Sequence, residues 1–313
     1  MILCVTANPC LDKTLAVPRW SPGDNVRGTS LREVVGGKGN NVARALARLG
    51  RPARPATFLG GVMGDLCEAL LREDDGFDPL IVPTRSATRV ILTVRGPDDA
   101  ATAFFDPDPD IAADEAATLV ERVESSLGRG GIEALTLSGS SPSAATHGLY
   151  AALAGAAKRH GIPAFVDTYG PALAAFRDAW PDAIQLNRRE AAAHLRIADP
   201  TEADLAGLLD SWARSGIRSA IVTDGPGRVL ARVDGRSFRV HPPRIEAVNP
   251  IGSGDCLLAG CVDGWLGGLD PAAMLRRAVA SATANALTWD AGGIDLATVK
   301  RLEADVMVEE VAG

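Results

Sequence analysis

The sequence predicts an α/β fold built on a parallel sheet, and three observations lead to that prediction. Beyond residue 111, segments of helical periodicity alternate with short apolar segments typical of buried strands. The 313 residues are 46% hydrophobic and 23% charged, as in globular proteins with a substantial core. Polar and glycine-rich motifs follow several predicted strands, where open α/β sheets bind their ligands. The predicted helices are 114–127, 143–159, 189–195 and 202–214, and the predicted strands are 133–137, 163–167, 183–186 and 218–223.

The N-terminal segment is predicted to form the first buried strand. Residues 2–7 are apolar and β-prone, and the dipeptide Asn8-Pro9 ends the run. Asp12 follows in the predicted loop, where it could hydrogen-bond the hydroxyls of a sugar or be an ordinary solvated aspartate. Residues 14–33 mix apolar residues with prolines and glycines, which indicates short strands in a small separate sheet.

Residues 36–41, Gly-Gly-Lys-Gly-Asn-Asn, are predicted to open a helix that ends near Gly50. The motif is not a Walker A loop, because no serine or threonine follows Lys38 and the four-residue spacer is missing. We interpret it as a helix start with free backbone N–H groups and one cation, suited to a ligand's hydroxyls or phosphate. The alternative is that Lys38 is an ordinary surface cation.

Two further strands are predicted at 80–83 and 88–95, and Arg89 and Arg95 flank the second of them. Either arginine is a candidate contact for a ligand. The acidic, proline-rich segment 106–110 resembles the start of a calcium loop. It lacks the glycine and the glutamate that such a loop requires at its sixth and twelfth places, so a calcium site is excluded.

Residues 249–255, Asn-Pro-Ile-Gly-Ser-Gly-Asp, lie where an extended segment is predicted to enter a helix. Gly252 and Gly254 permit close approaches that a side chain would block. The resulting backbone N–H groups at a helix N-terminus form an anion site. Asp255 beside such a site suggests phosphoryl transfer to a hydroxyl, with the carboxylate as general base. The alternative is a glycine turn whose aspartate merely caps the helix.

Asn187 and Glu190 lie three residues apart, at the start of a predicted helix, so their side chains share one face. Such groups could hold Mg²⁺ against the phosphates of a nucleotide, directly or through waters. They could also form a capping box, and both roles are compatible.

Composition excludes several classes of function. The formal net charge of −7 argues against a nucleic-acid surface. The five cysteines form no Cys-x-x-Cys pair and the four histidines are scattered, which argues against disulfides and a zinc site. No signal peptide and no apolar run of about 18 residues is present, so we expect a cytoplasmic protein without a membrane partner.

Three motifs, in this order, resemble those of the phosphofructokinase-B (ribokinase-like) family of sugar kinases. They are Gly-Gly-Lys-Gly-x-Asn at 36–41, Asn187-x-x-Glu190, and Gly252-x-Gly-Asp255. The resemblance covers essentially the whole chain. Asn-Pro-Cys-Leu-Asp at 8–12 and Asn-Val-Ala-Arg at 41–44 are similar to the branch acting on phosphorylated hexoses, which includes 1-phosphofructokinase and tagatose-6-phosphate kinase.

The resemblance implies a three-layer α/β/α sandwich with a mostly parallel central sheet, formed by residues 1–313 as a single domain. It also implies a small β-sheet lid from about 13–33 and 86–105, which is often the contact of a homodimer, and the use of ATP and Mg²⁺. The implied sugar contacts are Asp12, Gly37, Lys38 and Asn41, with Arg27, Arg89 and Ser140 for the sugar's existing phosphate; Asn187, Thr223, Gly225, Gly227 and Asn285 would line the ATP site, Glu190 would serve Mg²⁺, Gly252, Ser253 and Gly254 would form the anion hole, and Asp255 would be the base.

The sequence departs from the family pattern at four places. Asn40 replaces an apolar residue, and Asp224 stands where an apolar residue is more usual. Residues 138–144 lack the second proline and the glycine of the common form, which puts the role of Ser140 in doubt. The acidic segment 106–110 replaces the branch's usual Asn-Glu-Pro-Gly-Pro.

We therefore expect transfer of a phosphoryl group from MgATP to a hydroxyl of a phosphorylated ketohexose, with fructose 1-phosphate giving fructose 1,6-bisphosphate. An ordinary aspartate with a pKa near ~4 would suffice as base. Alternative acceptors are tagatose 6-phosphate, fructose 6-phosphate, an unphosphorylated sugar or a nucleoside. A sugar-phosphate sensor without catalysis is the non-enzyme alternative. A dinucleotide oxidoreductase is excluded, because residues 8–15 contain no glycine.

Overall fold

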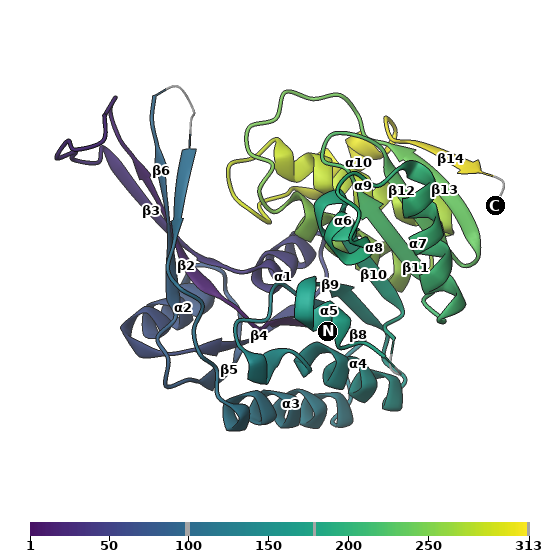
Figure 1. Cartoon of the computed structure of the whole chain (residues 1–313), viewed down its shortest axis with the longest axis horizontal. Helices are drawn as coiled ribbons and strands as arrows, with labels where there is room; N and C mark the ends of the chain where they lie inside the picture. Colours follow the sequence, from purple (N-terminus) through teal and green to yellow (C-terminus); the bar gives the residue numbers. More distant parts are fainter. Residues whose placement is uncertain (98–100, 178–179, 312–313) are drawn as a thin grey trace.

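The computed structural model describes residues 1–97, 101–177 and 180–311, and its largest element is a ten-stranded sheet (Figure 1). Seven neighbouring strands, from β5 to β11, are parallel, and the last three pair antiparallel. This arrangement confirms the predicted α/β fold. In spatial order the strands are β5 (Leu80–Pro83), β4 (Ala53–Leu59), β1 (Ile2–Thr6), β8 (Ala134–Ser138), β9 (Ala164–Asp167), β10 (Ala183–Asn187), β11 (Ser219–Thr223), β12 (Val229–Val233), β13 (Arg236–His241) and β14 (Met307–Val311).

Helices cover both faces of this sheet. The side chains of each strand alternate between the two faces, and in the parallel strands both sets are apolar, so both faces need to be covered. In β1, Leu3 and Val5 pack with one group of helices, whereas Ile2 and Cys4 pack with the other. All five cysteines are buried and free. The first group is α3 (Ala113–Gly128), α4 (Leu149–Arg159), α5 (Gly170–Ala174), α6 (Arg188–Leu195) and α7 (Glu202–Arg214); the second is α1 (Lys38–Arg48), α8 (Ser253–Leu266), α9 (Pro271–Ala286) and α10 (Leu296–Glu303).

A separate four-stranded sheet stands away from the main body in Figure 1. Its order is β3 (Ser30–Gly36), β2 (Cys10–Ala16), β6 (Arg89–Arg95) and β7 (Ala101–Phe105), and only β2 and β6 are parallel. Its base packs on α2 (Gly61–Glu73) through Leu11 and Val35. The edge strand β7 is exposed throughout, as are the first three residues of β3. Residues 98–100, which belong to the segment predicted as a lid, lie outside the described residues.

Several local predictions differ from the structure. Asp12 lies inside β2 rather than in a loop after the first strand. The segment 143–159 is a short 3₁₀ turn, η1 (Ala144–Thr146), followed by α4, which begins at Leu149. The C-terminal residues, for which the sequence analysis gives no element, form α10 and then β14, which pairs with β13.

Among the described residues, no helix combines the length and the apolar character that a membrane crossing requires.

Candidate active site

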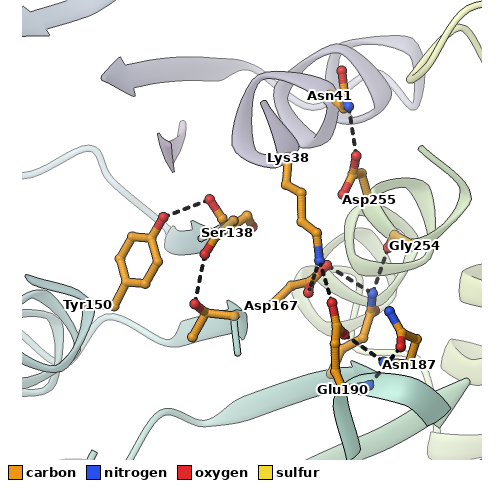
Figure 2. Close-up of polar contacts among 12 residues, drawn as sticks. Lys38, Asn41, Ser138, Tyr150, Asp167, Asn187, Glu190, Gly254 and Asp255 are labelled. Carbon is orange, nitrogen blue, oxygen red and sulfur yellow. Dashed lines mark hydrogen bonds and ion pairs between the residues drawn. The ribbon is translucent and has the colours of Figure 1, made fainter. Parts of the chain in front are cut away.

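The carboxyl ends of the parallel strands bring polar residues to one edge of the main sheet. Thr6 at the end of β1 pairs with Ser138 of β8, and Ser138 pairs with Asp167 of β9. Asn187, which ends β10, pairs with Thr223 of β11. Helices α1, α6 and α8 begin at the same edge, as their packing and Figure 2 show. The predicted motifs therefore meet at the position where parallel α/β sheets bind ligands.

The glycine turn before α8 has a backbone that a side chain would disrupt. Gly252 has a φ of 85°, in the left-handed region, and it immediately precedes the first helical residue, Ser253. A Cβ atom at position 252 would lie 2.7 Å from the Cβ of Ala291. The N–H of Ser253 donates to the carbonyl of Pro250 at 3.1 Å. No described hydrogen bond uses the N–H groups of Gly254 and Asp255, so these two can bind an anion at this turn.

Asn285 holds this turn from behind. Its Nδ2 donates to the carbonyl of Ile251 at 2.8 Å, and its Oδ1 accepts from the N–H of Gly292 at 2.9 Å. The residue is 0% exposed. Its amide therefore supports the anion turn, next to which the family resemblance implies the ATP site.

Asp255 lies in the first turn of α8, is 5% exposed, and points toward α1 in Figure 2. Its Oδ2 accepts a hydrogen bond of 2.7 Å from Nδ2 of Asn41. Burial, followed by the charge of Asp167, raises the pKa of Asp255 to about 7, although Lys38 opposes the shift. The expected ordinary pKa is therefore wrong, because the sequence does not show how deeply this carboxylate is buried or which charges surround it.

Lys38 connects two other carboxylates at this edge. Its Nζ lies 2.8 Å from Oδ1 of Asp167 and 3.2 Å from Oε1 of Glu190. Burial lowers the pKa of Lys38, but Asp167 and Glu190 outweigh it, so the net pKa is raised and the ammonium stays charged. The Lys38 side chain is 31% exposed and those of its partners 3% and 14%, so Lys38 is the group of the three that a ligand can reach most easily.

Asn187 and Glu190 form the predicted capping box at the start of α6. Oδ1 of Asn187 accepts from the N–H of Glu190 at 3.0 Å, and Oε2 of Glu190 accepts from the N–H of Asn187 at 2.9 Å. The contact of Glu190 with Lys38 uses the other carboxylate oxygen. The capping box thus fixes both side chains at the start of α6, and it leaves Oε1 of Glu190 facing Lys38.

Gln185 was not predicted as a site residue. It lies in β10, is 3% exposed, and its Nε2 donates to the carbonyl of Gly254 at 2.8 Å and to Asp167 at 3.3 Å. It thereby links the turn before α8 to the Lys38 partner. No local signal identifies a glutamine within an apolar strand as a site residue.

A second polar cluster brings together predicted and unpredicted residues. Nη1 of Arg89 donates to Oδ1 of Asp108 at 2.8 Å, and Nδ2 of Asn8 donates to the same oxygen at 2.8 Å and to Oγ of Ser140 at 3.0 Å. A Cβ at Gly139 would lie 3.9 Å from the Cβ of Lys38, so Ser140 follows a residue that packs beside Lys38. This cluster therefore adjoins the charged edge of the site.

The remaining predicted residues lie at the borders of these clusters. Asp12 is largely buried, and burial raises its pKa. Arg27 lies exposed in the connection between β2 and β3, and no described contact joins it to Arg89 or Ser140. Gly225 and Gly227 lie in the turn between β11 and β12, where the N–H of Gly227 donates to the carbonyl of Asp224 at 2.8 Å.

A model of the pfkB family carbohydrate kinases matches residues 5–293. The chain belongs to the pfkB family. It is thus an ATP-dependent sugar kinase. This finding decides against the alternative of a non-catalytic sugar-phosphate sensor.

Solved structures of pfkB-type enzymes match over nearly the whole chain. Phosphofructokinase-2 from Escherichia coli in complex with fructose-6-phosphate is 26% identical, with a TM-score of 0.85 over 97% of this chain and 98% of that chain. A possible 1-phosphofructokinase from Thermotoga maritima is 24% identical, with a TM-score of 0.89 over 100% of both chains. The second similarity establishes the shared fold.

Proposed function

We propose that this sugar kinase transfers the γ-phosphoryl group of ATP to a hydroxyl of a phosphorylated ketohexose, with fructose 1-phosphate as acceptor and fructose 1,6-bisphosphate as product. The observation that carries this proposal is the position of Asp255. Its carboxylate lies beside the anion turn at Gly252, on the same helix start, and is hydrogen-bonded to Asn41 of the Gly-Gly-Lys-Gly helix. The groups proposed as base, anion site and sugar-binding motif are therefore neighbours, which supports the proposal.

In the proposed reaction Asp255 takes the proton from the attacking hydroxyl. The O–H bond breaks as the oxygen bonds to the γ-phosphorus, and ADP leaves with the electrons of the bridging P–O bond. The N–H groups of Gly254 and Asp255 stabilise charge on the transferred phosphoryl group, that of Ser253 joins them if it leaves the carbonyl of Pro250, and Lys38 adds one positive charge nearby. A pKa of about 7 leaves Asp255 partly ionised near neutral pH and makes it a stronger base than an ordinary aspartate.

The carboxylates around Lys38 fit a magnesium ion that is bound mainly by phosphate oxygens and waters. Mg²⁺ in nucleotide sites usually takes one or two protein carboxylates. Glu190 and Asp167 supply two, and both contact the same ammonium. When bound, the ion neutralises charge on the nucleotide's phosphates, while Asn187, Thr223, Gly225, Gly227 and, through the turn, Asn285 shape the proposed ATP site.

Arg89 and Ser140 support an acceptor that already carries a phosphate. The Arg89 side chain is 14% exposed, and its guanidinium faces a cluster that includes Ser140. A guanidinium with a hydroxyl and an amide nearby is suited to an oxyanion. Asp12, Gly37 and Lys38 would contact the sugar's hydroxyls. Fructose 6-phosphate is the second candidate acceptor, because phosphofructokinase-2 from Escherichia coli has been solved with that ligand.

The small sheet, from about 13–33 and 86–105, would act as a lid within a single catalytic domain and as the contact of a homodimer. The sheet exposes Leu31 on β3 and Phe104 and Phe105 on β7 at 55%, 54% and 64%. Exposed apolar side chains on one sheet are typical of an interaction surface. A tetrameric form is known for phosphofructokinase-2 from Escherichia coli. Arg27, near this surface, would approach the acceptor's phosphate only if the lid moves.

The acceptor is tested by measuring ADP release from MgATP with the purified protein. The panel contains fructose 1-phosphate, fructose 6-phosphate, tagatose 6-phosphate, fructose, ribose and a nucleoside. The proposal expects the highest kcat/KM with fructose 1-phosphate. Turnover with only unphosphorylated acceptors would contradict the assignment of a phosphorylated acceptor.

A further inference from the structure

The geometry points to Asp108 as a specificity-determining residue. We propose that its carboxylate occupies the position at which Arg89 and Ser140 would hold the acceptor's phosphate, so that a phosphorylated acceptor must displace it. Asp108 thereby sets the affinity of the enzyme for phosphorylated acceptors relative to neutral ones. This inference rests on the proposed function, since it concerns the same subsite.

The contacts of Asp108 are those expected of a bound oxyanion. A single oxygen, Oδ1, accepts from Nη1 of Arg89 and from Nδ2 of Asn8, both at 2.8 Å. The same Asn8 nitrogen also contacts Oγ of Ser140 at 3.0 Å. Asn8 is 3% exposed, so its amide is a fixed part of the protein, whereas the Asp108 side chain is 46% exposed. The anion is thus the movable member of the cluster.

The cluster has binding capacity that Asp108 does not use. Among the described residues, Nε of Arg89 and Oδ1 of Asn8 are buried without a hydrogen-bond partner. A buried polar atom without a partner is costly, and a guanidinium binds oxyanions best through two N–H groups. A phosphate, with three terminal oxygens, could accept from Nη1 and Nη2, which share one edge of the guanidinium, and a bound water could accept from Nε on the other edge. The hydroxyl-bearing form of the phosphate, or a bound water, could donate to Asn8.

The protein positions Asp108 through the residues on either side of it. Asp106 is anchored to β6, because its Oδ2 accepts from the N–H of Val90 at 2.9 Å and its own N–H donates to the Val90 carbonyl at 3.0 Å. The carbonyl of Asp110 accepts from Oγ of Ser86 at 2.8 Å. Prolines at 107 and 109 restrict the backbone between these anchors. The side chain of Asp108 can therefore leave the cluster without a large movement of the segment.

A carboxylate and a phosphate cannot share this position, because two anions would compete for the same donors and repel each other. The apparent affinity for a phosphorylated acceptor is then reduced by the fraction of molecules in which Asp108 fills the subsite. A neutral sugar, which does not need Arg89, escapes this competition. Asp108 thus lowers affinity for one class of acceptor only.

The test compares Asp108→Asn with wild-type enzyme at saturating MgATP. We expect the KM for fructose 1-phosphate or fructose 6-phosphate to fall about tenfold, because an intramolecular competitor has lost its charge, with kcat within about twofold. The KM for a neutral sugar should stay unchanged. Asp110→Asn is the matched control: it removes the same charge from the same segment, but only the backbone of Asp110 makes a described contact, so its KM values should equal those of wild type.

An unchanged or raised KM for the phosphorylated acceptor in Asp108→Asn would overturn the inference and make Asp108 a support for Arg89. Thermal unfolding checks that each variant is folded. If Asp108→Asn does not fold, Asp108→Ser takes its place. If wild-type enzyme uses only neutral acceptors, the proposed function fails, and binding of fructose 1-phosphate by calorimetry then tests Asp108 by itself. Binding gained in Asp108→Asn and lost again on adding Arg89→Gln supports the inference, and no gain contradicts it.

Discussion

Replacing Asp255 with asparagine should stabilise the folded protein at alkaline pH, although it removes the proposed base. The pKa of Asp255 is about 7 in the folded protein, against an ordinary value of 3.8. Between these values the folded state binds more protons than the unfolded state, so stability falls as the pH rises from about 4 to 7. The loss of stability that comes from ionising the buried Asp255 is absent below pH 3.8 and complete above pH 7.

The size of this effect follows from the two pKa values. A difference from 3.8 to about 7 for a buried carboxyl corresponds to about 4 kcal/mol of stability at pH 8, of which about 3 kcal/mol develops above pH 4.5. Asparagine has nearly the same shape and no charge, and its carbonyl oxygen can still accept from Asn41. The free energy of unfolding of Asp255→Asn should therefore exceed that of wild type by an amount that grows with pH.

Urea unfolding followed by circular dichroism, from pH 4.5 to 8.5, measures this difference. We expect the gap between variant and wild type to widen by about 3 kcal/mol across that range. A gap that is constant with pH, or a variant that is less stable than wild type at pH 8.5, would refute the burial argument for Asp255. Ligands are left out of this assay, because bound nucleotide changes the charge near the carboxylate.

Three other predictions follow from the same geometry. Gly252→Ala should lower kcat by at least about 100-fold in steady-state assays, because the new Cβ would strain the left-handed backbone and lie 2.7 Å from the Cβ of Ala291, which displaces the anion turn. The control is Gly268→Ala, where φ is 66° but the space is open, and its kcat should be unchanged. Wild-type kcat/KM should fall below pH about 7 as the base is protonated. In Lys38→Met the residual activity should show this acid limb at higher pH, since the charge of Lys38 lowers the pKa of Asp255; an unmoved limb would argue against this effect of Lys38. Asp263→Asn should destabilise the protein by about 3 kcal/mol in urea unfolding without changing kcat, because it breaks the ion pairs of this buried carboxylate with Arg51 and Arg277, which lie away from the site. A stability close to that of wild type would show that these pairs contribute little.

The sequence was sufficient for those parts of the fold and the site that depend on local signals. The alternation of apolar segments and helical periodicity predicts the parallel strands, and the motifs at strand ends predict which segments meet at one edge. The capping box of Asn187 and Glu190 is a signal of this kind, because it lies within four consecutive residues. The pairing of β14 with β13 is not local: it joins segments about seventy residues apart, and neither segment shows its partner.

Contacts between distant residues explain what sequence analysis missed in the site. Lys38 was predicted to contact a sugar, but its ion pair with Asp167 joins α1 to β9 and has no sequence pattern. Asn285 was predicted near ATP, and only the folded chain shows that its amide is used to hold the turn at Ile251. The acidic segment at 106–110 was recognised as a departure from the family, yet its approach to Arg89 depends on the position of β6.

The central claim is that Asp255 removes the proton from the acceptor's hydroxyl beside the anion turn. Rapid-quench measurement of a single turnover, with saturating MgATP and the best acceptor, tests this step most directly. We predict that Asp255→Asn slows formation of the phosphorylated product by about 10² to 10⁴ while the acceptor's binding changes much less. A variant that forms product at nearly the wild-type rate would contradict the assignment of Asp255 as the base.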